Sequence, residues 1–263
     1  MFKMYKIFLV FFGFSISYIF IGCNNTSEPE TFFEASDRYS NHLSFPASVN
    51  QVVVTNPIGF IYLFGNTDIT KVSYVLDRKV NAKSKLIAES ELKTINLEYT
   101  VSNDTLYCNI FHHKDLNNFY NCTLNLDVPF NKDVSIKNPN KGIHSAYLNS
   151  NLKVETDAYE TIIEQHTGSI EARSTAGNIV SIISIPQNGF CRCISETGDI
   201  IARIPTSASV NVELKTTFGS ISYSNLNLNI TTFTNQLITG MLGNGEGDIY
   251  LESNYGEVKL EGF

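Results

Sequence analysis

Glycine returns at intervals of nine, twelve and nine residues between positions 168 and 200, and a residue of low polarity stands two positions after each glycine. The pairs are Gly168 and Ile170, Gly177 and Ile179, Gly189 and Cys191, and Gly198 and Ile200. Pieces of nine and twelve residues keep alternating towards the C-terminus, so the period is 21 residues. A fixed period of this size is typical of a solenoid, whose repeats bury apolar surface by stacking on one another. A β-sandwich also uses glycine turns, but it does not require one fixed period.

Each nine-residue piece alternates in polarity, as a strand does when one of its faces is buried. Its third and fifth positions hold Ile170 and Ala172, Cys191 and Cys193, Val212 and Leu214, and Ile249 and Leu251. We expect these side chains to line an interior, and the glycines to form corners, where glycine allows both positive φ and close backbone approach between rungs. The outward residues Glu171, Arg192 and Glu213 are then expected in successive turns, with alternating charges side by side.

The repeat divides the chain into regions. Residues 132–263 carry the pattern, with an insertion at about 225–243, and are expected to form the solenoid. Residues 45–131 contain several strand-like stretches and one stretch of good helix formers, "NAKSKLIAESELKTI", but no regular repeat. Because the first rung of a stack needs protection, we expect 45–131 to be a β-rich cap with a short helix.

The N-terminal residues have the features of an export signal. Lys3 and Lys6 precede an apolar run from Ile7 to Ile21, which is long enough for a signal-peptide core and short for a membrane span. The run ends in "FIGC", which resembles the lipobox of bacterial lipoproteins and implies that Cys23 is lipidated. Residues 1–22 are then a lipoprotein signal peptide and 23–44, which are polar and acidic, a flexible tether. The alternative is an ordinary signal peptide in which Cys23 has no such role.

Composition narrows the class of protein. The residues after position 44 number about 220, which is within the range of one long all-β domain. The net charge is -7 and no basic run occurs, which disfavours nucleic acid as a partner. Tyr and Phe are abundant and Trp is absent, and abundant aromatic residues suit strands.

Four cysteines follow Cys23, and export would permit disulfides. Cys108 and Cys122 each lie seven residues from Asp115, in strand-like stretches separated by a loop-like one. A hairpin centred on Asp115 would place them opposite each other, so we predict a disulfide between them. Cys191 and Cys193 occupy interior positions of the repeat and are expected to be small core side chains.

Two further patterns are weak signals for a ligand. His112 and His113 stand between Cys108 and Cys122, but the spacing is not that of a zinc site, so no metal is expected. The glycine-rich stretch "GMLGNGEGD" could cradle phosphate or, with Asp248, calcium. A phosphate loop needs a following helix, and calcium nonapeptides occur in stacked copies. We therefore expect a tight corner there, and no cofactor.

Carboxylates raise one enzymatic alternative, since β-helices can act on acidic polysaccharides. Asp199 lies near Arg203 in sequence, and the last turns carry Asp248, Glu252 and Glu257. The sequence places no His or Lys beside them as a base, and we expect a solvated face with no catalytic residues. The residues that bind a ligand are not indicated by the sequence.

The order of several degenerate motifs resembles a known family. "VVVTNPIGFIYLFGNTDITKVSYV", "LNLDVPFNKDVSI", the G-[SDN]-I repeats and "GNGEGDIYLESNYGEVKLEG" together look like the bacterial putative-adhesin domain of unknown function, over about residues 45–263. The resemblance implies an exported, membrane-anchored envelope protein whose repeats are similar to right-handed β-helices. It brings no agreed catalytic residues.

Together these observations predict an all-β protein, a single-chain β-solenoid with an N-terminal cap. The expected function is non-catalytic binding or scaffolding, as in an adhesin, on a lipid-anchored protein of the bacterial cell envelope that faces the periplasm or the surface. The expected partners are the membrane, through the lipid, and an envelope glycan or protein. The alternative is a β-helix enzyme that acts on an acidic polysaccharide. The oligomeric state is not indicated.

Overall fold

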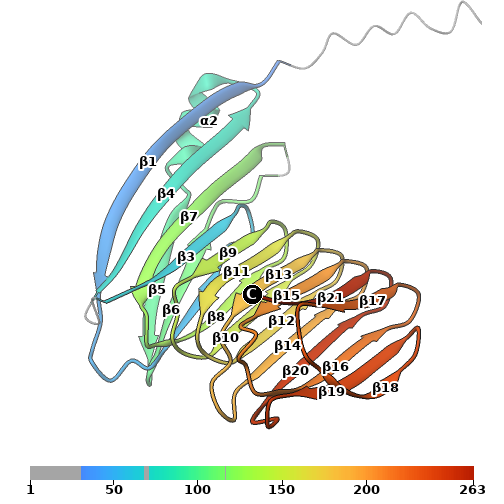
Figure 1. Ribbon diagram of the computed structural model, residues 1–263. Helices are drawn as coiled ribbons and strands as arrows, with labels where there is room; N and C mark the ends of the chain where they lie inside the picture. Colours follow the sequence, from blue (N-terminus) through green and yellow to red (C-terminus); the bar gives the residue numbers. More distant parts are fainter. Residues whose placement is uncertain (1–30, 68–70, 116) are drawn as a thin grey trace, which may run out of the picture.

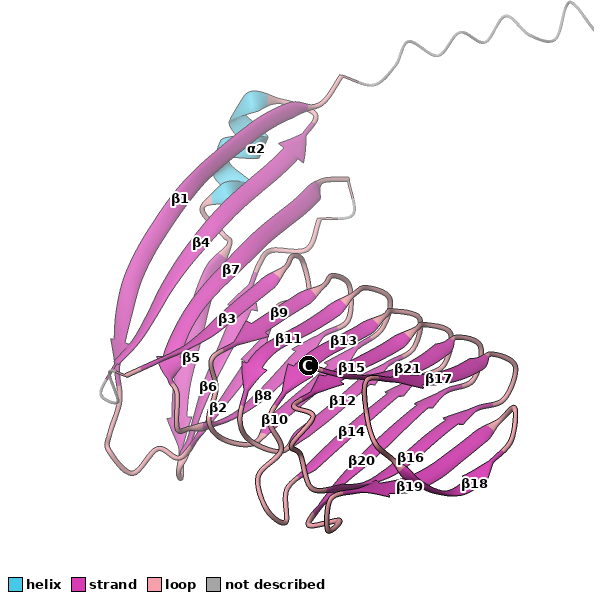
Figure 2. Cartoon of the chain, viewed as in Figure 1, coloured by secondary structure: helices cyan, strands magenta, loops and turns pink. Residues whose placement is uncertain are grey.

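The computed structural model describes residues 31–263, except 68–70 and 116. Two long sheets face each other, and the chain passes repeatedly from one to the other (Figure 1). Nearly all of the described chain is strand or turn (Figure 2). The prediction of an all-β solenoid is confirmed.

We call the ten-stranded sheet A and the eleven-stranded sheet B. Sheet A contains, in spatial order, β1 (Phe33–Ser44), β4 (Lys71–Ala82), β7 (Phe119–Pro129), β3 (Ile61–Asn66), β9 (Ile143–Ala146), β11 (Thr161–His166), β13 (Ile179–Ile183), β15 (Ile200–Ile204), β21 (Glu257–Gly262) and β17 (Ser220–Ser224). Sheet B contains β18 (Asn229–Phe233), β19 (Leu237–Leu242), β16 (Val210–Thr216), β20 (Gly247–Ser253), β14 (Phe190–Ser195), β12 (Ile170–Ser174), β10 (Leu152–Thr156), β8 (Asp133–Asn138), β2 (Gln51–Thr55), β6 (Thr105–Phe111) and β5 (Asn96–Ser102).

One strand of each sheet forms a rung, and neighbouring rungs pair in parallel from β6 and β7 to β16 and β17. The inward residues of successive rungs stand in register. Ile179 pairs with Ile200 in sheet A, and Ile200 with Val258. All three are fully buried, so the predicted inward positions are confirmed as the core between the sheets.

The spatial order of the rungs differs from their chain order at the C-terminal end. The strands β18 and β19, formed by the predicted insertion, make an antiparallel hairpin that pairs with β16. The last repeat, β20 and β21, then fits between the rung of β14 and β15 and the rung of β16 and β17. The predicted neighbourhood of Arg192 and Glu213 is therefore wrong, because Tyr250 of β20 lies between them.

The repeated glycines stand where backbones of neighbouring rungs approach closely. A Cβ at Gly198 would lie 2.1 Å from the carbonyl oxygen of Gly177, and one at Gly256 would lie 2.3 Å from that of Gly198. No side chain fits at these distances, so close approach explains the glycines. Among the glycines that the structure describes, positive φ is found at Gly243 and Gly245 in the turn before β20. That turn confirms the corner predicted for the glycine-rich stretch.

Buried hydroxyl groups complete the corners between sheet B and sheet A. The hydroxyl of Ser195 accepts a hydrogen bond from the Gly198 amide (2.9 Å) and donates one to the Gly177 carbonyl (3.1 Å). Ser253 donates to the Gly198 carbonyl in the same way (2.7 Å). A polar backbone group buried without a partner is costly, so these side chains let a tight corner be buried.

The N-terminal region contributes two complete rungs, β2 with β3 and β6 with β7, so the predicted boundary at 131/132 does not separate cap from solenoid. The cap consists of β5 on sheet B and of β1 and β4 on sheet A, all paired antiparallel. The predicted short helix is confirmed as α2 (Lys85–Leu92), capped by the Ser84 side chain and packed against β1 and β4.

The tether predicted for 23–44 is wrong for 33–44, which form β1. This strand is polar because it is the edge of sheet A, where Leu43 is its one buried residue. Charged side chains on β1 pair with those of β4, for example Arg78 with Asp37. A polar edge strand and a tether have similar compositions, which explains the error.

Candidate functional site

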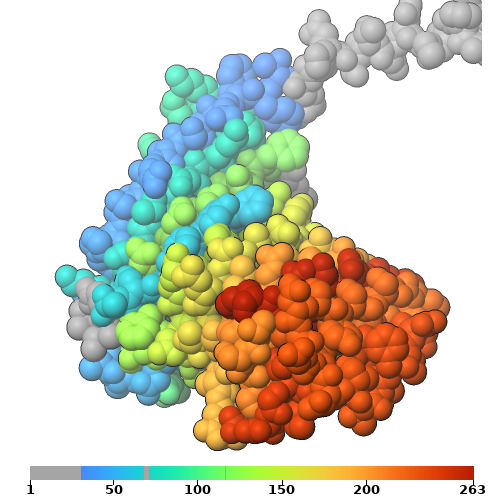
Figure 3. Space-filling model, viewed as in Figure 1, coloured from blue at the N-terminus to red at the C-terminus, as the bar shows by residue number. Residues whose placement is uncertain are grey.

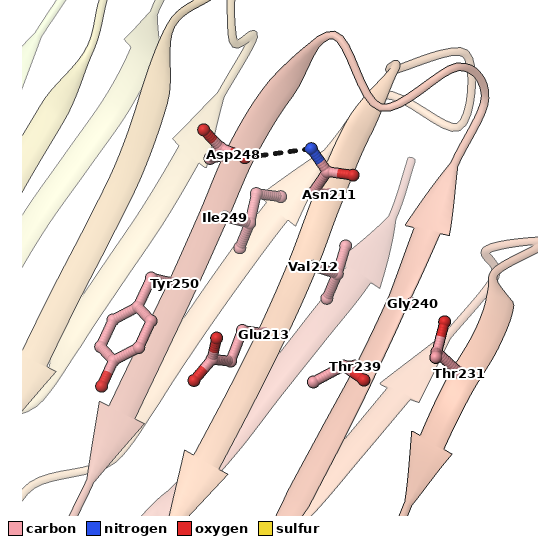
Figure 4. A pocket seen from close by; sticks show the side chains of 9 residues that line it. All are labelled: Asn211, Val212, Glu213, Thr231, Thr239, Gly240, Asp248, Ile249 and Tyr250. Atoms are coloured by element: carbon pink, nitrogen blue, oxygen red, sulfur yellow. Dashed lines mark hydrogen bonds between the residues drawn. The ribbon is translucent and has the colours of Figure 1, made fainter.

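A shallow cleft crosses the outer face of sheet B near its C-terminal end. One hollow of about 410 Å³ lies between β20 and β18, and a second of about 420 Å³ extends from β20 to β12. Both are lined by Asp248 and Tyr250, so they adjoin along β20. In Figure 3 the C-terminal rungs, coloured orange to red, cover most of the lower part of the visible face. Figure 4 shows the first hollow from close by.

The residues of the first hollow come from four neighbouring strands. Strand pairing sets Asn211 beside Asp248, and it sets Glu213 between Tyr250 and Thr239. Thr231 of β18 closes the far side (Figure 4). The site owes its shape to the rung order, because the hairpin of β18 and β19 extends sheet B beyond the end of sheet A.

Tyr250 lies at the centre of the cleft, between two charged neighbours. The Arg192 guanidinium lies 5.1 Å from the centre of its ring, a cation–π contact. The Tyr250 hydroxyl donates to Glu252 at 2.5 Å, and Lys215 donates to the other oxygen of the same carboxylate at 2.7 Å. These contacts hold the tyrosine ring in place with one side facing the cleft.

The acidic groups of the cleft are ionised or engaged with neighbours. Burial works against the charge of Glu252, but the hydrogen bonds from Lys215 and Tyr250 outweigh it and lower the pKa of this carboxyl. Burial raises the pKa of Tyr250, which stays a neutral donor. Asp248 accepts from Asn211 at 3.1 Å. A general acid needs a raised pKa, and Glu252 has the opposite.

Glu213 is the exception among these acids. Within the described part of the chain, no hydrogen bond or ion pair engages its half-buried carboxylate. It faces the hollow beside Tyr250 and Thr239 (Figure 4). An unpaired acceptor next to a fixed aromatic ring is suited to receive hydrogen bonds from a polar ligand.

The carboxylates considered for catalysis are not brought together. Asp199 lies at the corner that leads into sheet A, where it accepts from the backbone amide of Glu257 at 2.7 Å. Arg203 pairs with Glu261 at 2.7 Å, so it does not serve Asp199. Asp248 and Glu252 lie on the outer face of sheet B. Asp199 and Glu257 are thus corner residues of the stack, on a different part of the surface.

The predicted hairpin around Asp115 is wrong. Cys108 is on β6 of sheet B and Cys122 on β7 of sheet A, so the segment between them is a corner rather than a hairpin turn. Each strand pairs with a rung of its own sheet, because both strands have an apolar inner face to bury. Both thiols are free and buried, and burial raises the pKa of each to about 12.

The other residues considered in the sequence analysis lie in the core, contact neighbouring side chains, or fall outside the described residues. Cys191 and Cys193 are free thiols in the core, with their Sγ atoms 3.7 Å apart. His112 packs edge-on against the Tyr120 ring, and His113 lies 3.5 Å from Glu91. Among the described residues, no group of three or more His, Cys, Asp or Glu side chains is arranged to hold a metal. Cys23 and the predicted signal peptide at 1–22 lie outside the described residues.

Sequence reasoning missed two residues that line the cleft, Tyr250 at its centre and Phe190 in the second hollow. It missed Tyr250 because the order of repeats along the chain hides its place between Arg192 and Glu213. Phe190, at the start of β14, is 43% accessible. The alternation of inward and outward positions in the sequence does indicate that this aromatic side chain points outward. Outward aromatic residues in a repeat are candidates for binding, because packing does not need them there.

The Toastrack DUF4097 family model matches residues 141–261, from the turn before β9 into the last strand, β21. The resemblance to a domain of unknown function is confirmed over this part of the chain. No curated protein matches the chain. Within residues 31–67, 71–115 and 117–263, no helix is both long enough and apolar enough to cross a membrane.

Several solved structures are similar to this one. The crystal structure of a putative cell adhesion protein from Clostridium sporogenes aligns with a TM-score of 0.50 and 12% sequence identity, over 87% of this chain and 100% of the other. A putative adhesin from Bacteroides fragilis aligns with a TM-score of 0.33 and 13% identity, over 87% of this chain and 98% of its own. The likeness to the first protein shows a shared fold.

Proposed function

We propose that this chain is a lipid-anchored protein of the bacterial cell envelope that binds an extended polysaccharide in the cleft of sheet B, without cleaving it. The observation that carries the proposal is the cleft itself. It crosses neighbouring strands and offers a fixed aromatic ring, a guanidinium and an unpaired carboxylate in one row, Tyr250 between Arg192 and Glu213. A row of such groups makes many modest contacts along a polymer.

Binding is favoured over catalysis by the state of the acidic groups. Hydrolysis of a glycosidic bond uses two facing carboxyls, one of them protonated. In the cleft Glu252 is held ionised and Asp248 is engaged by Asn211, while Asp199 and Glu257 lie at a corner. The adhesin names of similar folds agree with a binding role, and the envelope location follows from the lipobox-like sequence.

Cosedimentation of the full-length protein with insoluble acidic and neutral polysaccharides tests the binding. We expect Tyr250→Ala and Glu213→Gln each to weaken binding about tenfold. Tyr107→Ala, an exposed tyrosine on β6 of the same sheet, is the matched control and should bind as the wild type does. Equal binding by all four proteins would refute the assignment of the cleft.

Chromatography of the same incubations tests for cleavage. No shorter products are expected after prolonged incubation with the wild type. Cleavage that disappears on replacing Asp199, Asp248 or Glu257 by alanine would overturn the proposal in favour of the enzyme.

The anchor is tested separately by metabolic labelling with a radioactive fatty acid. The wild type should incorporate label, and Cys23→Ala should not. Label that persists in the variant would show that Cys23 is not the acceptor, without bearing on the cleft.

A further inference from the structure

The outer face of sheet A carries a row of apolar and aromatic side chains. Strand pairing aligns one outward residue from each of five neighbouring strands, and all five are half-buried. The row runs Tyr62, His144, Ile162, Val180, Ile201. Side chains on the outside of a solenoid are not required by the core, so an apolar row there indicates contact with something else.

The aromatic end of the row is hollowed. A hollow of about 330 Å³ is lined by side chains from three strands and the turns before them. Its principal side chains are Phe60, Tyr62, His144, Tyr159, Glu160 and Ile162. Its volume is at the lower limit of the range for small-molecule sites. It lies on the sheet opposite the cleft described above, so it is a separate site.

Contacts with neighbouring side chains hold the rings of this hollow in place. His144 packs edge-on against Tyr62 and Phe64, with ring centres 6.0 and 5.8 Å apart. Its Nε2 atom lies 3.1 Å from a carboxylate oxygen of Glu164. Phe60 lies over Gly142, where a Cβ would stand 3.3 Å from the ring. The rings thus form a fixed platform, which reduces the entropy lost on binding.

Charged groups stand at the rim of the platform. The Lys141 ammonium lies 5.0 Å from the Tyr159 ring centre and 5.8 Å from that of Phe60. Among the described residues it makes no ion pair with a carboxylate. Glu160, which is exposed, also lines the hollow. The rim therefore offers both hydrogen-bond donors and acceptors around an apolar floor.

We propose that this hollow is a second binding site, which takes a pyranose ring of a neutral oligosaccharide. A pyranose has a face of C–H groups that fits the electron-rich face of an aromatic ring. Its hydroxyls both donate and accept, which matches a rim with an ammonium and carboxylates. The proposal does not depend on the function of the cleft in sheet B.

Other ligands fit the hollow less well. A quaternary ammonium would be repelled by the Lys141 ammonium, which lies 5.0 Å from the Tyr159 ring centre and 5.8 Å from that of Phe60. A hydrocarbon chain would cover Lys141 and Glu160 and leave these charges without water or partners. A neutral sugar satisfies both the rings and the rim.

Isothermal titration calorimetry of the full-length protein with cellohexaose, maltohexaose and chitohexaose tests the proposal. We expect saturable binding of at least one of these neutral oligosaccharides by the wild type. The double variant Phe60→Ala with Tyr159→Ala should lose at least tenfold in affinity. The matched control is Tyr147→Ala, an exposed tyrosine that follows β9 but does not line the hollow, and it should bind normally.

A second measurement on the wild type removes any dependence on how the variants fold. Saturation-transfer NMR should pass magnetisation from aromatic protons of the protein to the C–H face of the bound sugar. Absence of binding by all three oligosaccharides would overturn the proposal. So would binding that survives loss of both rings, or transfer that reaches the sugar from aliphatic protons alone. These outcomes leave the polysaccharide cosedimentation of the other cleft unaffected, so the two proposals fail independently.

Discussion

Along one row of outward positions, the two outer faces of the solenoid differ in polarity although they belong to the same rungs. Where the rung of β12 and β13 presents Glu171 on sheet B, it presents Val180 on sheet A. The next rung presents Arg192 on one side and Ile201 on the other. Inner positions are fixed by packing, whereas outer positions are free to vary. We infer from this difference that the outer faces of sheets A and B make different contacts.

The largest effect should come from placing a charge on the inner face. Ile200→Asp puts a carboxylate into the fully buried core of β15, and we expect it to lower the free energy of unfolding by more than about 4 kcal/mol. Ile201→Asp, one residue along and half-exposed on the outer face, is the matched control and should cost about 1 kcal/mol or less. Denaturant unfolding followed by circular dichroism measures both. Similar losses would mean that inner and outer positions have been assigned wrongly.

A buried histidine should make stability depend on pH. Burial lowers the pKa of His166 from 6.5 to about 4, so the folded protein holds it neutral. Because the unfolded chain binds the proton more readily, this contribution is complete above about pH 6.5 and is lost as the pH falls towards 4. The loss should be about 3 kcal/mol. His166→Gln should flatten the stability profile between pH 6.5 and 4. An unchanged slope in this variant would contradict the burial.

A smaller effect is expected at the corners. Ser195→Ala leaves the buried Gly198 amide without its acceptor, which should cost about 1–3 kcal/mol. Thr197→Ala removes an exposed hydroxyl two residues later and should cost a few tenths of a kcal/mol. Thermal unfolding of the two variants side by side decides the point. Equal melting temperatures would show that the corner hydroxyl contributes little.

The smallest effect concerns how readily a reagent reaches the cysteine thiols, and not the free energy of unfolding. All four described cysteines lie on the inner faces as free thiols. We expect these four thiols to react fast in denaturant and very slowly in the native protein, because their buried side chains are out of reach of the reagent. A disulfide between Cys108 and Cys122, found by peptide mapping, would contradict the structure.

The repeats could be predicted from sequence because the rungs share one rule, with apolar residues inward and, in most rungs, a glycine where backbones touch. At Ile200 and Gly198, for example, the residue type alone indicates an inward position and a close backbone contact. The helix was predictable too, since Ser84 and the helix formers after it act locally. Which strands pair with each other, by contrast, is not determined by the local sequence. The polar strand β1 resembles a tether until its partner β4 is known.

The cleft could not be predicted for the same reason. Its central contact joins Arg192 to Tyr250, which are far apart in the chain and meet because the last repeat inserts between two earlier ones. Likewise the hollow on sheet A joins Phe60 to Tyr159 through Lys141. Each outward residue was visible in the sequence, but its neighbours depend on the order in which rungs stack.

Chemical-shift mapping of the isotopically labelled protein tests most directly whether the two faces bind different ligands. Titration with the neutral oligosaccharide should shift backbone amides of β3, β9 and β11 on sheet A and leave β14, β20 and β16 unchanged. A soluble fragment of the polysaccharide that cosediments with the protein should do the reverse. Shifts from both ligands on one and the same face, or spread evenly over both, would contradict the account.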